Sequence, residues 1–203
     1  YNASNSGASM NEEKLYFKWA IEQGRLEQVL LVADFRMFNF FTQKSIPDLE
    51  SYFDPKINKY KLLFTFDALK DLVNTIFSNE ILDTKYLSNG QQNPLPTHTE
   101  NLRDFIDSGD RTYYTDYPVD YRYRDTGEKS FLDFEELLKL CYENQIELVI
   151  IFGPSHVRQW ESLNYHLGIS HWFKWKKDVV LSVSNIANKF NRMPFDVFDF
   201  SVY

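Results

Sequence analysis

Three segments of this sequence end in polar side chains that could bind a ligand or take part in catalysis. The imidazole of His156, paired with a carboxylate such as Asp199, could activate a hydroxyl group as a nucleophile. Ser155 and Arg158 flank His156 and could line the same pocket. The three groups are Asp34, Arg36 and Asn39; Ser155, His156 and Arg158; and Asp199 and Ser201.

Each polar group follows a segment that we expect to be a β-strand. Leu148 to Phe152 is an unbroken apolar run, which predicts a strand buried on both faces, and Gly153-Pro154 ends it. Val29 to Ala33 and Phe195 to Asp199 are the other two predicted strands. Ligands of open α/β sheets bind beyond the carboxyl ends of the strands, so we expect the three polar groups to meet at one edge.

Helical patterns separate the predicted strands. Five segments are expected to be helical: Ser9 to Gln23, Leu62 to Phe77, Ser130 to Asn144, the residues after His156 to His166, and Ser170 to Asn191. Ser9, Ser130 and Ser170 are the expected N-caps, and Ser9 forms a capping box with Glu12. Gly24 is expected to follow the end of the first helix. Strands that alternate with helices predict an α/β fold with a mostly parallel sheet and helices on both faces.

We expect residues 1–203 to form a single α/β domain with an irregular, Tyr-rich insertion at about 84–127. The chain begins at Tyr1 without an initiator Met, and it stops four residues after the last predicted strand. The expectation is therefore a domain that is incomplete at both ends.

A catalytic triad within the chain would pair His156 with Asp199 and use Ser9 or Ser155 as the nucleophile. Both serines also fit the N-cap position of a helix, which would occupy their hydroxyl groups. His156 could equally bond a backbone carbonyl at a helix start, and Asp34 and Asp199 could bond loop amides at the strand ends. The residues alone leave both interpretations open.

Composition excludes several classes of function. A net charge of -7 argues against nucleic-acid binding, which needs a basic surface. No apolar run approaches the roughly 20 residues of a membrane span, and no nucleotide-binding motif is present. The histidines lack metal-ligand spacing, and Asp116, Asp120 and Asp125 do not follow a calcium-loop pattern. We expect neither a cofactor nor a metal.

An unusual tract contains tyrosines at positions 113, 114, 117, 121 and 123 without helical spacing. Aromatic rings could form a platform for carbohydrate. Alternatively, the tract is a loop whose rings cover the core while their hydroxyl groups remain in water.

Four short motifs, in this order, resemble a group of bacterial SGNH-hydrolase-like proteins, some of them associated with exopolysaccharide genes. The motifs are Tyr1-Asn2 with Ser6-Gly-Ala-Ser9, Val32-Ala-Asp-Phe-Arg-Met-Phe-Asn39, Phe152-Gly-Pro-Ser-His156 and Phe198-Asp-Phe-Ser201. The resemblance implies a flavodoxin-like, three-layer α/β/α fold and ester chemistry. It also implies an exported, periplasmic or membrane-anchored protein, with any anchor outside this chain.

The resemblance assigns Gly7 to the oxyanion hole and the Asp34 to Asn39 segment to a third block, in which the usual Gly-x-Asn-Asp is absent. His156 matches the Pro-x-His element of this group. The Gly-x-Ser segment with the nucleophile and the Asp/Glu-x-x-His segment with the catalytic base should lie before Tyr1 and after Tyr203.

The leading hypothesis is the core of an esterase or O-acyl (acetyl) transferase or hydrolase that acts on a cell-envelope or exported polysaccharide, or on an acylated small molecule. Gly7 and His156 would be catalytic, and the chain alone would be inactive. The substrate-binding residues would be Asp34, Arg36, Asn39, Ser155, Arg158 and Asp199. The alternatives are a non-catalytic α/β module that binds polysaccharide or a partner protein, and an unrelated flavodoxin-like response or scaffold domain.

Overall fold

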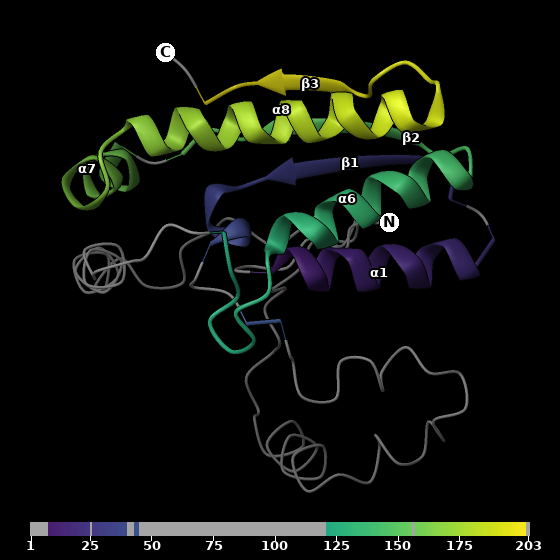
Figure 1. The fold of residues 1–203 in the computed structure, drawn as a ribbon, viewed down its shortest axis with the longest axis horizontal. Helices are drawn as coiled ribbons and strands as arrows, with labels where there is room; N and C mark the ends of the chain where they lie inside the picture. The colour runs from purple at the N-terminus through teal and green to yellow at the C-terminus, as the bar shows by residue number, and fades with distance from the viewer. Residues whose placement is uncertain (1–7, 25, 40–42, 45–120, 156, 202–203) are drawn as a thin grey trace, which may run out of the picture. The chain divides into compact units, whose positions relative to one another are not determined.

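A computed structural model describes residues 8–24, 26–39, 43–44, 121–155 and 157–201 (Figure 1). The chain divides into two compact units, residues 1–2 with 47–102 and residues 3–46 with 103–203, and all described residues belong to the second unit. The predicted helix at 62–77, most of the Tyr-rich tract, Gly7 and His156 lie outside the described residues.

Three parallel strands form the sheet, in the order β1-β2-β3. They are β1 (Gln28–Ala33), β2 (Glu147–Phe152) and β3 (Asp196–Asp199). Ala33 is paired with Phe152, and Phe152 with Asp199, so the three strands end in register. The prediction of an α/β fold with a parallel sheet is confirmed.

Helices and one 3-10 turn connect and flank the strands. They are α1 (Met10–Glu22), η1 (Phe35–Phe38), α6 (Ser130–Glu143), α7 (Val157–His166) and α8 (Ser170–Phe190). The Ser9–Glu12 capping box predicted for α1 is present, with the Ser9 hydroxyl accepting from the Glu12 amide and the Glu12 carboxylate accepting from the Ser9 amide. Gly24 follows the helix with a φ of 74°.

The expected caps of α6 and α8 are wrong. Ser130 is the first residue of α6, and its hydroxyl donates to the Phe38 carbonyl at 2.6 Å, so it ties the helix to η1. Ser170 is the first residue of α8, because the backbone is already helical at Ile169. The cap predicted at Ser155 for α7 remains a prediction, because the residue between Ser155 and Val157 lies outside the described residues.

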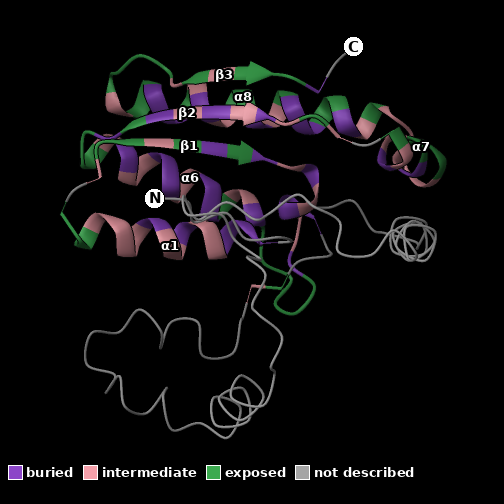
Figure 2. Cartoon of the chain, turned by 180° about the vertical axis from the view of Figure 1, so that it is seen from behind, coloured by how far each residue is buried: buried purple, intermediate pink, exposed green. Residues whose placement is uncertain are grey.

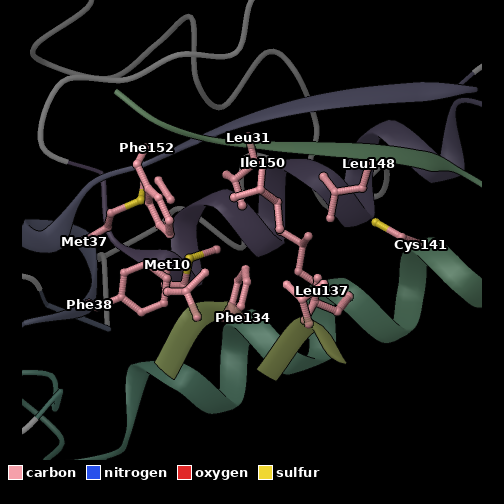
Figure 3. Close-up of a cluster of buried hydrophobic side chains, with 14 of the residues drawn as sticks. Met10, Leu31, Met37, Phe38, Phe134, Leu137, Cys141, Leu148, Ile150 and Phe152 are labelled. Atoms are coloured by element: carbon pink, nitrogen blue, oxygen red, sulfur yellow. The ribbon is translucent and has the colours of Figure 1, made fainter. Parts of the chain in front are cut away.

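Helices α1, α6 and α8 cover one face of the sheet, and the core lies between these helices and the strands (Figure 3). Neighbouring side chains of a strand point to opposite faces. Most side chains of β1 and β2 on the covered face are buried, and they contact apolar residues of α1, η1, α6 and α8. The buried strand residues are Leu31, Ala33, Leu148, Ile150 and Phe152.

The opposite face of the sheet is open in the part of the chain that the structure describes, and Figure 2 views the strands from that side, with α6 and α8 behind them. Leu30 is 60% exposed and Val32 is 53% exposed. Right-handed crossovers that advance in one direction along a sheet leave their helices on the same face. The order β1-β2-β3 therefore explains why α6 and α8, which lie in the connections between the strands, are on the same face of the sheet.

Aromatic side chains of α8 fill the core at the carboxyl end of the sheet. The ring of Trp175 lies 5.0 Å from Phe152, 5.3 Å from Trp172 and 5.7 Å from both Phe35 and Phe38, measured between centroids. Trp175 is fully buried. A single residue of α8 thus joins η1, β2 and the rest of its own helix.

A buried ion pair joins α1 to α6. The Lys14 ammonium donates to Asp133, and the Tyr123 hydroxyl donates to the other oxygen of the same carboxylate at 2.6 Å. Burial alone lowers the pKa of Lys14, but hydrogen bonds to Asp133 and Glu136 outweigh burial and raise it. Every charge in this buried contact therefore has a partner, as burial requires.

Replacing Trp175 by Ala should destabilise the protein by about 3–5 kcal/mol, because it empties the centre of the aromatic cluster. Leu181→Ala on the same helix is the control, since Leu181 is 47% exposed. Urea unfolding followed by circular dichroism measures both. Equal losses in the two variants would contradict this account of the core.

The carboxyl group of Glu13 on α1 makes the stability of the folded chain depend on pH. Burial, with a smaller contribution from neighbouring Glu12, raises the pKa of Glu13 to about 7 from its ordinary value of 4.5. The folded state then binds a proton that the unfolded state has released, so the contribution of Glu13 to stability falls as pH rises from 4.5 to about 7.

Glu13→Gln should therefore raise the melting temperature at pH 8 and change it little at pH 4.5. Thermal unfolding across this range measures the difference, with the exposed Glu22→Gln as control on the same helix. A stabilisation that does not depend on pH would show that the carboxyl group is not the cause.

Candidate functional site

The carboxyl ends of all three strands lie at one edge of the sheet. The aligned pairs Ala33 with Phe152 and Phe152 with Asp199 place the next residues of each strand side by side, and the Phe200 amide donates to the Phe152 carbonyl at 3.0 Å. Asp34, Gly153 and Phe200 therefore leave the sheet at a common edge, as the strand pattern predicts. We call this set of strand ends the carboxyl edge.

Asp34, at the end of β1, caps the turn that follows. Its Oδ1 accepts from the Arg36 amide at 3.0 Å, which starts η1, and lies 3.5 Å from Nε2 of Gln159. Gln159 belongs to α7 and is buried. Bonding a loop amide at the strand end is one of the two roles that the sequence suggests for Asp34. The other role, contact with a substrate, remains a prediction.

The other predicted residues after β1 and β2 differ in how far they are buried. Asn39 is 2% exposed and donates from Nδ2 to the Phe35 carbonyl at 2.6 Å, which closes η1. Arg36 and Ser155 are half-buried, and so is Arg158 in the first turn of α7. Asn39 thus lies inside the fold, whereas the other three retain exposed surface at the carboxyl edge.

Asp199, at the end of β3, organises a polar network. Its Oδ1 accepts from the Ser201 amide at 3.0 Å and from the Ser201 hydroxyl at 2.7 Å, while Oδ2 accepts from Lys176 Nζ at 2.8 Å. Partial burial tends to raise the pKa of Asp199, but the hydrogen bonds from Lys176 and Ser201 outweigh it and lower the pKa below its ordinary value of 3.8. Asp199 is therefore held as a carboxylate.

Lys176, like Gln159, is a residue at this edge that the sequence interpretation missed. It lies on α8, is 7% exposed, and its ammonium is 5.4 Å from the ring centroid of Trp172 and 5.7 Å from that of Phe152. Aromatic faces attract a cation, and Asp199 supplies the opposite charge. A signal existed in the sequence, because Lys176 lies four residues after Trp172 and three before Val179, on the buried stripe of the helix.

Gly7 and His156, the two residues predicted to be catalytic, lie outside the described residues. The oxyanion role of Gly7 and the pairing of His156 with Asp199 therefore remain predictions. Ser9 is described, is 1% exposed and accepts from the Glu12 amide. Its hydroxyl serves the capping box, which favours the cap over a nucleophile.

Two tyrosines of the Tyr-rich tract are described: Tyr123 is buried, and Tyr121 is partly buried and packs against the core. Tyr121 makes an edge contact with Phe131, with 5.1 Å between ring centroids, and Tyr123 is 1% exposed with its hydroxyl bonded to Asp133. The hydroxyl groups of Tyr121 and Tyr123 are buried. The interpretation of the tract as a loop whose rings cover the core placed these hydroxyl groups in water. The ring of Tyr123 is therefore not available as a carbohydrate platform, whereas Tyr121 keeps part of its surface exposed.

The described part of the chain has neither a cluster of metal ligands nor a membrane-spanning helix. Its His, Cys, Asp and Glu residues form no group of three or more that could hold a metal ion. None of its helices is long and apolar enough to cross a membrane.

Comparison with known proteins finds no matching family, no similar curated protein and no similar solved structure.

Lys176→Met should destabilise the protein by about 1–3 kcal/mol at neutral pH, because it keeps much of the side chain's apolar stem but leaves Asp199 without its cation. The pKa of Asp199 is lowered in the folded state, so the contribution of this carboxylate is present above 3.8 and is lost as pH falls through the folded-state pKa. The gap between wild type and Lys176→Met should accordingly shrink at low pH.

Chemical denaturation at a series of pH values measures this gap. Lys177→Met is the control, since Lys177 is the exposed neighbour on the same helix. If Lys177→Met causes an equal loss, or the gap does not change with pH, the ion pair with Asp199 does not stabilise the carboxyl edge.

Proposed function

We propose that this chain is the core of an SGNH-like esterase or O-acyl (acetyl) transferase that acts on a cell-envelope or exported polysaccharide. The observation that carries the proposal is the carboxyl edge, where three parallel strands end in register and the polar segments after β1 and β3 leave the sheet together. This is where open α/β sheets bind ligands. The order of the four sequence motifs supports the specific chemistry.

The proposal includes a flavodoxin-like fold with a second layer of helices. The open face of the sheet supports it, because parallel sheets are almost always covered on both faces.

Gly7 would supply an oxyanion donor through its own backbone amide. The amides of Glu12 and Glu13 at the start of α1 already bond Ser9, and the Asn11 amide bonds the Tyr123 hydroxyl. The helix start would therefore contribute mainly the positive end of its dipole to a negative oxygen before Ser9.

In the reaction, a serine hydroxyl from a Gly-x-Ser segment attacks the acyl carbonyl while its proton passes to a histidine base. The sugar oxygen leaves and takes up a proton, and water or an acceptor hydroxyl then receives the acyl group. The proposal assigns this serine and this base to segments outside residues 1–203. His156, Ser155 and Arg158 would line the pocket at the end of β2.

The 203-residue chain should not hydrolyse nitrophenyl acetate faster than buffer, because it lacks the nucleophile. A longer gene product that contains a Gly-x-Ser segment should hydrolyse it, and replacing that serine by Ala should reduce kcat by about 10³-fold or more. The exposed Lys177→Met variant of the longer product is the control and should keep full activity. Robust turnover by the 203-residue chain would contradict the assignment of the nucleophile.

A non-catalytic α/β module that binds polysaccharide or a partner protein is the second candidate. It is favoured because the side chains of Asp34, Asp199 and Ser9 already form hydrogen bonds that stabilise local structure. Absence of esterase activity in the longer product, together with retained glycan binding, would select this candidate.

A further inference from the structure

The described residues on the two sides of segment 45–120 meet at one place in the fold. Phe38 lies shortly before this segment, and Tyr121 lies directly after it. The Ser130 hydroxyl lies 2.6 Å from the Phe38 carbonyl and 3.1 Å from the Tyr121 carbonyl, which also accepts from the Ser130 amide at 2.9 Å. The first residue of α6 therefore bonds the chain both before and after the segment.

Lys44, the last described residue before the segment, is held in the same region. Its amide donates to Asp125 at 2.9 Å, and its ammonium donates to Glu128 at 2.5 Å. The Lys44 carbonyl accepts from the side chain of Asn11 at 2.9 Å, and the Asn11 amide bonds the Tyr123 hydroxyl. Asn11 therefore joins the start of α1 to the chain on both sides of the segment.

The chain that follows the segment forms a turn that leads directly into α6. Arg122 pairs with Lys129 in an antiparallel bridge, and the Tyr123 amide donates to the Glu128 carbonyl at 2.9 Å. Ser130 and Tyr123 are buried, and buried polar groups need hydrogen-bond partners, so these contacts fix the turn against the fold. We call the residues that join the two sides of the segment the neck: Asn11, Lys44, Tyr121, Tyr123 and Ser130.

The sheet and its core are built from residues on either side of the segment. We call residues 8–44 and 121–201 the sheet domain. Within this domain, 20 buried apolar residues pack into one cluster between the helices and the strands. Residues 47–102 belong to a different compact unit from the one that contains the sheet. Domain boundaries fall where few contacts cross, and insertions are tolerated where the two chain ends lie close together.

We propose that segment 45–120 is an insertion that the sheet domain does not need for folding, because the neck closes the domain without it. A short connection between Lys44 and Tyr121 can then replace the 76 residues of the segment. The sequence suggested an insertion at about 84–127, whereas the proposed boundaries are 45 and 120 because Tyr121 and Tyr123 belong to the neck. Any activity of the segment would be separable from the carboxyl edge. This proposal does not rest on ester chemistry.

Tryptophan fluorescence reports on the sheet domain alone, because none of the tryptophans lies in the segment. The four tryptophans of the chain are Trp19, Trp160, Trp172 and Trp175. Urea unfolding of the full chain, followed by this fluorescence, therefore measures the stability of the sheet domain separately.

Substitutions within the segment of the full chain test the proposal. The double variant Leu69→Asp, Val73→Asp places two charges on the apolar stripe of the helix predicted at 62–77, and it should leave the urea midpoint unchanged. Leu137→Ala is the control in the core of the sheet domain, where Leu137 is 2% exposed, and it should raise the unfolding equilibrium constant about 30-fold or more. A lower midpoint in the double variant would overturn the proposal.

Replacing residues 45–120 by Gly/Ser linkers of eight and sixteen residues tests independence directly. Eight residues reach about 28 Å, which is about twice the reach of the four-residue arm from Tyr121 to Asp125, where the Lys44 amide is bound. Both shortened chains should unfold cooperatively at the urea midpoint of the full chain, and acrylamide should quench their tryptophans no more than in the full chain. Loss of cooperative unfolding with both linkers would contradict the proposal.

A longer deletion, of residues 45–127 with the same linkers, is the matched control because it also removes Tyr121 and Tyr123 from the neck. The Asn11 amide and the buried carboxylate of Asp133 then lose the Tyr123 hydroxyl as a partner. The unfolding equilibrium constant should therefore exceed that of the shorter deletion about tenfold or more. Equal stability of the two deletion variants would show that the neck does not close the domain, and the proposal would fail.

Discussion

The parallel register of β1, β2 and β3 is the constraint on which the rest of the structure depends. Pairing Ala33 with Phe152, and Phe152 with Asp199, fixes which side chains face the core and where all three strands end. A shift of one residue would turn Leu31 and Ile150 away from the helices. The hydrophobic core and the carboxyl edge are thus two results of one alignment.

The carboxyl edge combines aromatic packing with charge. Trp172 and Phe152 belong to the core, yet they also lie near the Lys176 ammonium, whose carboxylate partner Asp199 terminates β3. A buried ammonium is tolerated only with such a partner. The network therefore links the position of α8 to the conformation of the chain that leaves the sheet, and any ligand at this edge would meet a preorganised carboxylate.

Much of this architecture can be predicted from the sequence. The apolar runs gave the three strands, and the spacing of Trp172, Trp175, Val179 and Val183 gave α8. Capping was predicted correctly at Ser9, where serine is followed three residues later by glutamate, but not at Ser130, whose hydroxyl bonds a carbonyl 92 residues away in sequence. Contacts of that kind depend on tertiary packing, which local patterns do not contain.

The same reasoning explains the residues that were missed at the candidate site. Gln159 and Lys176 are polar residues on helices, and their approach to Asp34 and Asp199 depends on how α7 and α8 pack against the strand ends. Strand-end positions, by contrast, follow from the chain order of a parallel sheet. The sequence thus indicated the edge of the sheet more reliably than the side chains that neighbouring helices bring to it.

The burial of the Cys141 thiol has a practical consequence for labelling the protein. It is the only cysteine of the chain, it is fully buried on α6, and burial raises the pKa of its thiol to about 12. Thiolate is the reactive form, so this sulfur should be inert toward maleimides and oxidants while the protein is folded. A single cysteine introduced on the surface could then carry a spin label or fluorophore without removal of the native one.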